Sequence, residues 1–304
     1  MRVMITGATG LIGSRLVERL HHEGHTILVL TRQPEKATQQ FARHRFPRVE
    51  IMGYTPVEPG MWQETIPHWD GVVNLAGEAI AAGRWTEAIK QELRRSREVG
   101  TRTLVEGINQ AIPCPSVLVN ASAIGYYGTS ETATFDETSP PGSDFLATLC
   151  QAWEAEATLV KTRLVILRFG IALDATGGAL GKMVLPFQLF SGGPLGHGQQ
   201  WVSWIHIDDL VNLILHALTD PSMEGTFNAT APNPVRMHTF CQTIGQVIHR
   251  PSWLPVPAFA LNLLLGEGAS VVLEGQQVLP KRTLASGFTY HYPTLPQALT
   301  QILK

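Results

Sequence analysis

The feature that most constrains the fold is a glycine-rich turn, Thr6–Gly13, near the start of the chain. Its glycines stand at i, i+3 and i+6, between an apolar stretch at residues 3–5 and a segment with apolar residues at helical spacing from residue 11 to residue 20. One glycine permits a tight strand-to-helix turn, one lets the backbone approach a pyrophosphate, and one allows close helix–strand packing. The pattern predicts a dinucleotide-binding βαβ unit, with the phosphates at the helix N-terminus. No Gly-Lys-Ser/Thr follows, so a P-loop is excluded.

Short apolar runs and helical periodicity alternate over the first half of the chain, as in successive βαβ units. Further strands are predicted at residues 25–30, 49–52, 71–75, 117–121 and 164–169. Helices are predicted from Thr86 to Ala111, with a break at Gly100, and after the N-cap pair Ser143-Asp144 as far as Lys161. We therefore expect an α/β fold, a Rossmann-type doubly wound parallel sheet with a smaller C-terminal substrate-side subdomain.

The residue composition and the hydrophobic periodicity of the sequence change near residue 170. Residues 170–200 are rich in glycine, and helices are predicted at residues 207–218 and 237–248 before a proline-punctuated end. We expect residues 1–170 to form the dinucleotide-binding domain, with a possible return of a strand and a helix from residues 200–230. Residues 171–304 would then form the substrate-side and C-terminal module.

Composition excludes several functional classes. A formal net charge of -2 gives no basic surface of the kind that nucleic-acid binding needs. No apolar run approaches the roughly 18–20 residues of a membrane helix. The 3 cysteines are an odd number without a CxxC pair, so neither a disulfide framework nor a structural zinc site is expected. These features predict a soluble, cytoplasmic protein without a metal, and they leave the oligomeric state open.

The end of the second predicted strand, Leu30-Thr31-Arg32-Gln33, distinguishes between the two nicotinamide dinucleotides. Proteins that bind NAD place an acid there to hold the ribose 2′-OH, whereas an arginine accommodates a 2′-phosphate. No acid occurs before Glu35, Thr31 offers a hydroxyl, and Arg32 is able to stack on adenine and pair with a phosphate. The expected cofactor is NADP(H).

Several segments resemble a known group. Thr6–Gly13 is similar to the TGxxGxxG fingerprint of the extended short-chain dehydrogenase/reductase superfamily, and Asn74–Gly77 resembles its NxAG-type segment. More narrowly, the whole chain resembles an atypical subgroup labelled epimerase family proteins. The pieces that carry this narrower resemblance are Asn74–Glu78, Gly125–Gly128, Trp204–Asp209 and Gly275–Pro280. The resemblance implies an NADP(H)-binding fold, a small C-terminal module of unknown role and a substrate that is not established for the subgroup.

The fingerprint, the Asn74–Gly77 segment and the ends of the second and fifth predicted strands give the residues expected to bind the cofactor. They are Gly7, Thr9, Gly10, Leu11, Ile12, Gly13, Thr31, Arg32, Asn74, Leu75, Ala76, Gly77 and Ala121. Arg97 falls where the superfamily often has an asparagine and either faces the cofactor or lies on the surface. His206 with Asp208 and Asp209 resembles a metal cluster, but adjacent carboxylates at a helix start are better explained as capping groups.

The resemblance also implies a Tyr-x-x-x-Lys pair, in which the lysine holds the nicotinamide ribose and lowers the pKa of a catalytic tyrosine. None of the 5 tyrosines has a lysine four residues further on. Ser122 and Tyr127 remain near the expected nicotinamide position, but Ser122 stands five residues before Tyr127 instead of four. Either one residue is inserted, or Ala123 takes the place of the serine.

We predict Tyr127 as the proton donor and Ser122 as the group that orients a carbonyl. The alternative is that the tyrosines only pack the site wall with hydrogen-bonded hydroxyls. Two functions follow: an NADP(H)-binding oxidoreductase or epimerase-like protein acting on a small carbonyl or sugar-like substrate, or a catalytically silent NADP(H)-binding protein that senses redox state or docks a partner.

Overall fold

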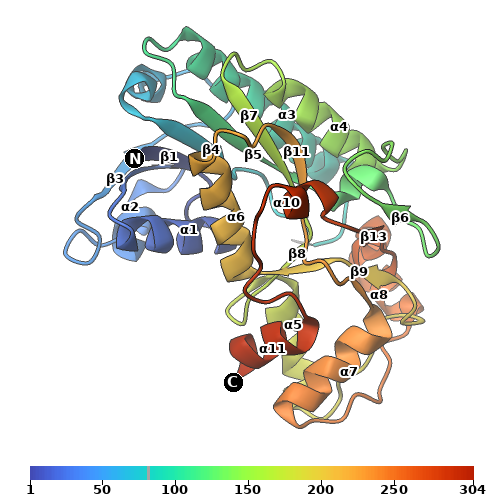
Figure 1. Ribbon diagram of the computed structural model, residues 1–304. Coiled ribbons are helices and arrows are strands. Elements are labelled where there is room, and N and C mark those ends of the chain that lie inside the picture. Colours follow the sequence, from blue (N-terminus) through green and yellow to red (C-terminus); the bar gives the residue numbers. More distant parts are fainter. Residues whose placement is uncertain (81–82) are drawn as a thin grey trace.

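A seven-stranded sheet forms the centre of the molecule in the computed structural model, which describes residues 1–80 and 83–304 (Figure 1). Its strands are β1 Arg2–Thr6, β2 Thr26–Thr31, β3 Val49–Gly53, β4 Gly71–Asn74, β5 Val117–Ala123, β7 Arg163–Phe169 and β11 Gly225–Ala229. All neighbours run parallel, in the order β11-β7-β5-β4-β1-β2-β3. The strand order reverses at β1, so the predicted Rossmann-type sheet is confirmed.

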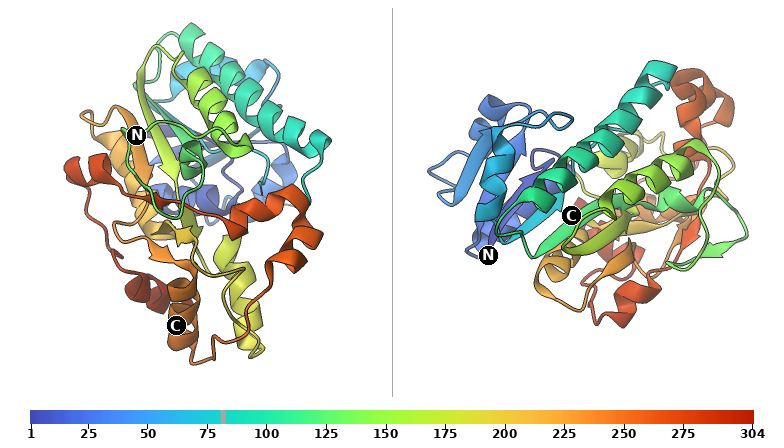
Figure 2. Two further views of the ribbon diagram at one scale, coloured as in Figure 1. Left: turned by 90° about the vertical axis from the view of Figure 1, so that its right-hand side faces the viewer. Right: turned by 90° about the horizontal axis from the view of Figure 1, so that it is seen from above.

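Helices cover both faces of the sheet because successive strand residues point to opposite sides. Val3 and Ile5 of β1 pack in one core with α1 and α6, whereas Met4 between them packs in a second core with α3 and η1. The helices and the 3-10 segment concerned are α1 Leu11–His22, α2 Pro34–Gln40, η1 Met61–His68, α3 Glu87–Gln110, α4 Phe145–Ala157 and α6 Ile207–Thr219. In both views of Figure 2, α3 and α4 lie side by side on one face of the sheet.

Two helix predictions need correction. α3 is continuous through Gly100, where a break was expected. A glycine costs a helix interior about 1 kcal/mol relative to alanine, and the buried residues Arg97 and Leu104 on either side anchor both halves. Asp144 is the N-cap of α4 as predicted, since its Oδ1 accepts from the backbone N–H of Ala147 at 2.9 Å. The helix ends at Ala157, earlier than the predicted Lys161.

The chain leaves the sheet after β7 and builds a smaller second layer at the carboxyl ends of the strands (Figure 1). The second layer has its own apolar core, centred on Phe187, Trp204, Phe240 and Leu299. Its elements are β8 Ile171–Leu173, α5 Gly178–Gln188, β9 Trp201–Val202, β10 Trp204–His206, β12 Val235–Arg236, α7 Met237–Ile248, α8 Ala258–Leu265, η3 Gly266–Ala269, α9 Ser270–Leu273, β13 Gln277–Val278 and α11 Leu295–Leu303. The short helix α10 Lys281–Ala285 packs along β11 instead. The edge strand β11 also comes from beyond residue 170 and pairs with β7. The domain boundary near residue 170 stays a prediction.

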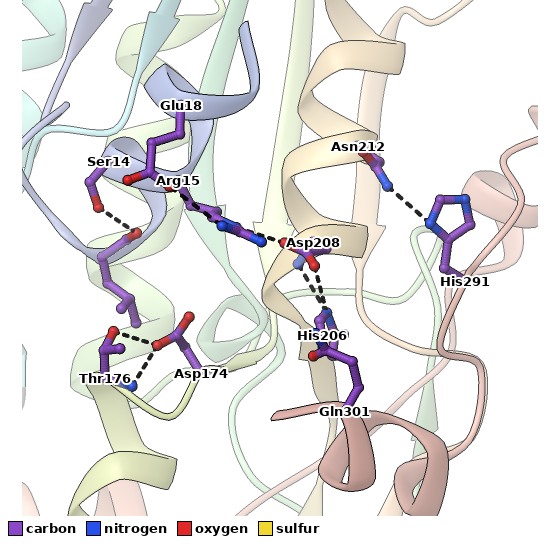
Figure 3. A network of polar contacts seen from close by, with 11 residues as sticks. Ser14, Arg15, Glu18, Asp174, Thr176, His206, Asp208, Asn212, His291 and Gln301 are labelled. Atoms are coloured by element: carbon purple, nitrogen blue, oxygen red, sulfur yellow. Dashed lines mark hydrogen bonds and ion pairs between the residues drawn. The ribbon is translucent and has the colours of Figure 1, made fainter. Parts of the chain in front are cut away.

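Polar contacts join this second layer to α1 and α6 (Figure 3). Arg15 on α1 donates from Nε to Asp208 Oδ1 at 2.8 Å. The backbone N–H of Asp208 donates to His206 Nδ1 at 3.0 Å, which leaves Nε2 of that ring to donate to Gln301 Oε1 at 2.8 Å. One histidine therefore caps α6 and ties it to α11.

The carboxylates at the start of α6 do not act as its cap, contrary to the prediction. His206 is the N-cap residue, and Asp209 is fully buried. The two oxygens of Asp209 accept backbone N–H groups of His291 at 2.8 Å and Tyr292 at 2.9 Å, so this carboxylate fastens the C-terminal segment. Over the described ranges, no cluster of three His, Cys, Asp or Glu side chains is arranged to hold a metal, and no helix is long and apolar enough to cross a membrane.

Candidate functional site

The glycine-rich turn between β1 and α1 is held against the loop that follows β4. Gly7 has a φ of +70°, and a Cβ there would lie 2.6 Å from the carbonyl carbon and oxygen of Leu75. The backbone N–H of Gly10 closes the turn by donating to Gly7 O at 3.1 Å. Only glycine fits position 7, because both its backbone angle and its clearance exclude a side chain.

The start of α1 is available to an anion. Gly13 lets the helix pack onto the turn, since a Cβ there would come within 2.3 Å of Gly7 O. Gly10 occupies the N-cap position without a side-chain cap, and the first turn contains no acidic residue. Thr9, Leu11 and Ile12 around it are partly exposed. Free N–H groups and the helix dipole at such an end favour an anion, and the binding of the cofactor phosphates there stays a prediction.

Asn74 organises the strand ends from inside the fold. Its Oδ1 accepts from Thr6 Oγ1 at 2.7 Å, and its Nδ2 donates to Asn120 Oδ1 at 2.7 Å and to Thr101 Oγ1 at 3.0 Å. The side chain is 3% exposed and its polar atoms are already engaged. The side chain of Asn74 thus bonds within the fold, and its predicted part in cofactor binding stays a prediction. The loop after it, with Leu75 and Ala76 partly exposed and Gly77 exposed, faces outward.

The end of β2 places Arg32 at the surface. Thr31 is buried, and its Oγ1 accepts from the backbone N–H of Gln33 at 3.1 Å, so this hydroxyl stabilises the turn. The side chain of Arg32 is 64% exposed, and its Nη2 lies 3.5 Å from Glu78 Oε2. The Arg32 guanidinium is thus accessible to solvent. Its ion-pair partner within the protein is the carboxylate of Glu78, from the loop after β4.

Ser122 near the end of β5 lies inside the protein. Ala121 and Ser122 are 4% and 2% exposed, and Ser122 Oγ donates to Glu154 Oε1 on α4 at 2.6 Å. Ala123, the next residue, is partly exposed. The serine hydroxyl is therefore directed into the space between β5 and α4, whereas position 123 offers no hydroxyl at the strand end.

Tyr127 is also buried, at 3% exposure, in the short 3-10 segment η2 Ile124–Tyr127 that follows β5. Its hydroxyl donates to Asn228 Oδ1 at 2.7 Å and accepts from Arg168 Nη1 at 2.9 Å. Burial raises the pKa of Tyr127 to about 12, although the nearby Arg168 opposes the shift. Tyr126 is partly exposed, and the centre of its ring lies 3.3 Å from Arg168 Cζ.

Three polar residues of this network were not predicted. Glu154 and Arg168 form a buried ion pair, and Asn228 on β11 completes the contacts of Tyr127. The sequence does contain a signal for Arg168, because it is a charged residue inside the apolar run of residues 164–169. A charge in a buried strand requires a partner, and α4, the helix before this strand, carries two glutamates, Glu154 and Glu156.

The C-terminal segment closes over the same network. Asn228 Nδ2 donates to Leu279 O at 3.0 Å, and Gln276 Nε2 donates to Ile124 O at 2.9 Å. β13 pairs with β6 Thr134–Phe135, which follows η2 in the chain. The Gly275–Pro280 piece singled out in the sequence therefore packs against the wall that holds Tyr127.

A Rossmann-type sheet with an uncapped, glycine-led helix at its reversal point defines a dinucleotide-binding class of protein. The model of the NAD dependent epimerase/dehydratase family matches residues 3–170, and a domain of unknown function, DUF1731, matches residues 256–302. The chain belongs to the NAD dependent epimerase/dehydratase family, which confirms the resemblance described above.

Several relatives match the whole chain, and each of them is named an epimerase family protein. An Arabidopsis thaliana protein, "Epimerase family protein SDR39U1 homolog, chloroplastic", is 51% identical over 100% of this chain and 87% of its own length. The Bacillus subtilis epimerase family protein YfhF is 39% identical over 100% of this chain and 98% of its own length. The human epimerase family protein SDR39U1 is 37% identical over 100% of both chains. The C-terminal module is thus shared with these relatives.

Solved structures agree with the fold. The crystal structure of human SDR39U1 (isoform 2) with NADPH matches with a TM-score of 0.88 and 37% identity, over 99% of each chain. A Thermotoga maritima UDP-glucose 4-epimerase with UDP-glucose matches with a TM-score of 0.80 at 15% identity, over 99% of this chain and 97% of the other. The second likeness concerns the fold alone.

Proposed function

We propose that this protein binds NADP(H) across the carboxyl ends of β2, β1, β4 and β5 and acts as an oxidoreductase or epimerase-like enzyme on a small carbonyl or sugar-like substrate. The adenosine half lies at the end of β2, and the diphosphate lies at the start of α1. The nicotinamide half continues towards β5. The human relative described as crystallised with NADPH supports the choice of cofactor.

The observation that carries the proposal is Arg32, an exposed guanidinium at the end of β2 with no acid in the position that would bind a 2′-OH. A guanidinium is able to donate two parallel hydrogen bonds to a phosphate, and the same charge gains nothing from a free ribose hydroxyl. Arg32 therefore favours the phosphorylated dinucleotide over the unphosphorylated one.

Calorimetric titration of wild type and Arg32→Glu with NADPH and NADH tests the proposal. NADPH binding should weaken by about 1.5–3 kcal/mol in the variant, the scale of a charge-assisted contact, whereas NADH binding should change little. Arg43→Glu, at another exposed arginine, controls for the change in net charge. Equal affinity of the wild type for NADPH and NADH would contradict the 2′-phosphate assignment.

For the chemical step, Tyr127 is the proposed proton donor and Ser122 the proposed carbonyl-orienting group. Both hydroxyls have protein partners, so a substrate must displace Asn228 from Tyr127 and Glu154 from Ser122 before either hydroxyl reaches it. A movement of η2, which holds Tyr127, and of the covering C-terminal segment would have to accompany substrate binding.

The engaged hydroxyls favour a second candidate function, a catalytically silent NADP(H)-binding protein that senses redox state or docks a partner. A tyrosine with a pKa near 12 is a weak acid at neutral pH. NADPH oxidation measured with a panel of aldehydes, ketones and keto-sugars separates the two functions. Turnover with any member supports the enzyme, and tight NADPH binding without turnover across the panel supports the silent protein.

A further inference from the structure

Arg97 of α3 carries a buried charge at the edge of the candidate site. The residue is 7% exposed, and its Nη2 donates to the backbone carbonyl of Glu78 at 2.9 Å, while Nη1 donates to Leu93 O at 3.3 Å. A Cβ at Gly77 would come within 3.1 Å of Arg97 Cζ, so the backbone of the loop after β4 lies directly on the guanidinium. The Trp153 ring centre lies 5.1 Å from Cζ.

The contacts of Arg97 leave both charge and hydrogen-bonding capacity unsatisfied. Its Nε is buried without a partner among the residues that the structure describes. Over the same residues, no carboxylate oxygen lies within 4.0 Å of its nitrogens, because Glu78 pairs through its carboxylate with Arg32 instead. A buried cation that lacks a counter-ion is costly, and an unsatisfied N–H adds to the cost.

The surrounding charges do not supply the missing partner. The other buried guanidinium near the ends of β5 and β7, Arg168, is paired with Glu154 in two hydrogen bonds, at 2.7 and 2.8 Å. Cys150, which faces Arg97 from α4, has its pKa raised to about 11 by burial, so the thiol is neutral. Glu154 is engaged with Arg168, so among the residues that the structure describes no carboxylate is in ion-pair contact with Arg97.

The position of Arg97 on α3 relative to the strands indicates which part of the dinucleotide it faces. Arg32 stands at β2, on one side of β1, whereas β4 and β5 lie on the other side. The Glu78 side chain reaches back to Arg32, but Arg97 lies against Trp153 of α4, and α4 packs on β5. In such sheets the dinucleotide crosses the strand ends at the reversal point, with its two halves on opposite sides of the first strand. The half on the β4 side is the one beyond the diphosphate.

We propose that Arg97 binds the nicotinamide-side ribose of NADP(H), with its Nε–H donating to a ribose hydroxyl. The inference rests on the proposed NADP(H) binding. α4 contains neither lysine nor arginine, so Arg97 reaches this end of the sheet from α3, and its Nε–H has no partner among the residues that the structure describes. The contact satisfies the buried Nε and brings an oxygen acceptor to the uncompensated charge.

Three ligands of increasing length locate this contact by calorimetry: 2′-phospho-ADP, which has both phosphates of the diphosphate but no second ribose, 2′-phospho-ADP-ribose and NADPH. Only the last two contain the second ribose. Arg97→Met should weaken the binding of 2′-phospho-ADP-ribose and NADPH about ten- to hundredfold and leave the binding of 2′-phospho-ADP within about twofold. Arg95→Met, at an exposed arginine of the same helix, is the matched control and should change none of the three.

The pattern across the ligands separates a contact from a merely structural role. If Arg97 only supports the loop after β4, the affinity of Arg97→Met for all three ligands falls together, and the proposal is overturned. It is also overturned if wild type and Arg97→Met bind NADPH equally. Wild type that fails to bind NADPH would refute the proposed function itself.

Arg97→Lys covers the case in which the methionine variant does not fold. Lysine keeps the charge but lacks the Nε–H and the planar fork. We expect a smaller loss, again confined to the two ligands that contain the second ribose. Unchanged NADPH affinity in a folded lysine variant would overturn the hydrogen bond from Nε.

Discussion

Arg168 on β7 and Glu154 on α4 form a buried bidentate ion pair, with Nη2 to Oε2 at 2.7 Å and Nε to Oε1 at 2.8 Å. Ser122 donates to the carboxylate, and Tyr127 accepts from the guanidinium. The two hydroxyls predicted to take part in catalysis are therefore connected through one ion pair. Changes to either charged residue should alter both hydroxyls together.

Removing the charge of Glu154 should destabilise the fold strongly. Glu154→Gln leaves the Arg168 guanidinium buried without a counter-ion, and breaking a buried pair in this way costs about 3–5 kcal/mol. Urea unfolding of both proteins at neutral pH measures the difference. Glu156→Gln breaks the more exposed pair with Arg102 on the same helix and should cost no more than about 1 kcal/mol. Equal losses in the two variants would contradict this account of the Glu154 pair.

Tyr127→Phe should lower turnover about 10²–10⁴-fold on a substrate found in the carbonyl panel, because the proposed general acid is removed. NADPH affinity should stay nearly unchanged, since the ring and its packing against Phe135 are kept. Steady-state kinetics and calorimetry on the same preparation give both quantities.

Tyr126→Phe is the matched control for that variant, because it removes a neighbouring hydroxyl from a partly exposed ring. Full activity in Tyr127→Phe would show that the proton comes from another group. Loss of NADPH binding in the same variant would show that the network of Arg168 and Asn228 has collapsed.

The raised pKa of Tyr127 predicts a loss of stability at alkaline pH. Below pH about 10 the tyrosine is protonated in the folded and unfolded states alike. Between its ordinary pKa and the folded value of about 12, the unfolded chain releases the proton and the folded protein keeps it. The free energy of unfolding should therefore fall over this range as pH rises.

Urea unfolding of wild type and Tyr127→Phe at several pH values from 9 to about 11.5 measures that component. Tyr54 and Tyr290 also have pKa values raised by burial and contribute to both proteins, so the difference between the two curves isolates Tyr127. Parallel curves would contradict the burial of its hydroxyl.

Glu78→Gln should tighten NADPH binding about two- to fivefold. Its carboxylate lies 3.5 Å from the Arg32 guanidinium and competes with a 2′-phosphate for the same donors. An exposed pair of this kind is worth about 0.2–1 kcal/mol, which sets the size of the gain. Calorimetry with NADPH and NADH checks the prediction, and a similar gain for both ligands would assign the effect to the loop instead of the phosphate.

Local sequence determined the first βαβ unit. The glycine spacing of the Thr6–Gly13 turn corresponds to the two positions, Gly7 and Gly13, where the folded backbone leaves no space for a Cβ. Asp144 could likewise be recognised as an N-cap, because a cap bonds to a backbone group three residues away. Both features can be recognised without knowing which distant segments of the chain lie beside them.

Only the tertiary structure decided what the candidate catalytic groups contact. Tyr127 meets Asn228, 101 residues further on, because β11 pairs with β7 at the edge of the sheet. Ser122 meets Glu154 because α4 packs across the end of β5. Hydrophobic periodicity specifies which face of each element is buried, but it does not specify which element covers that face. The partners of a buried hydroxyl depend on that choice, so they emerge only when the strands are placed side by side.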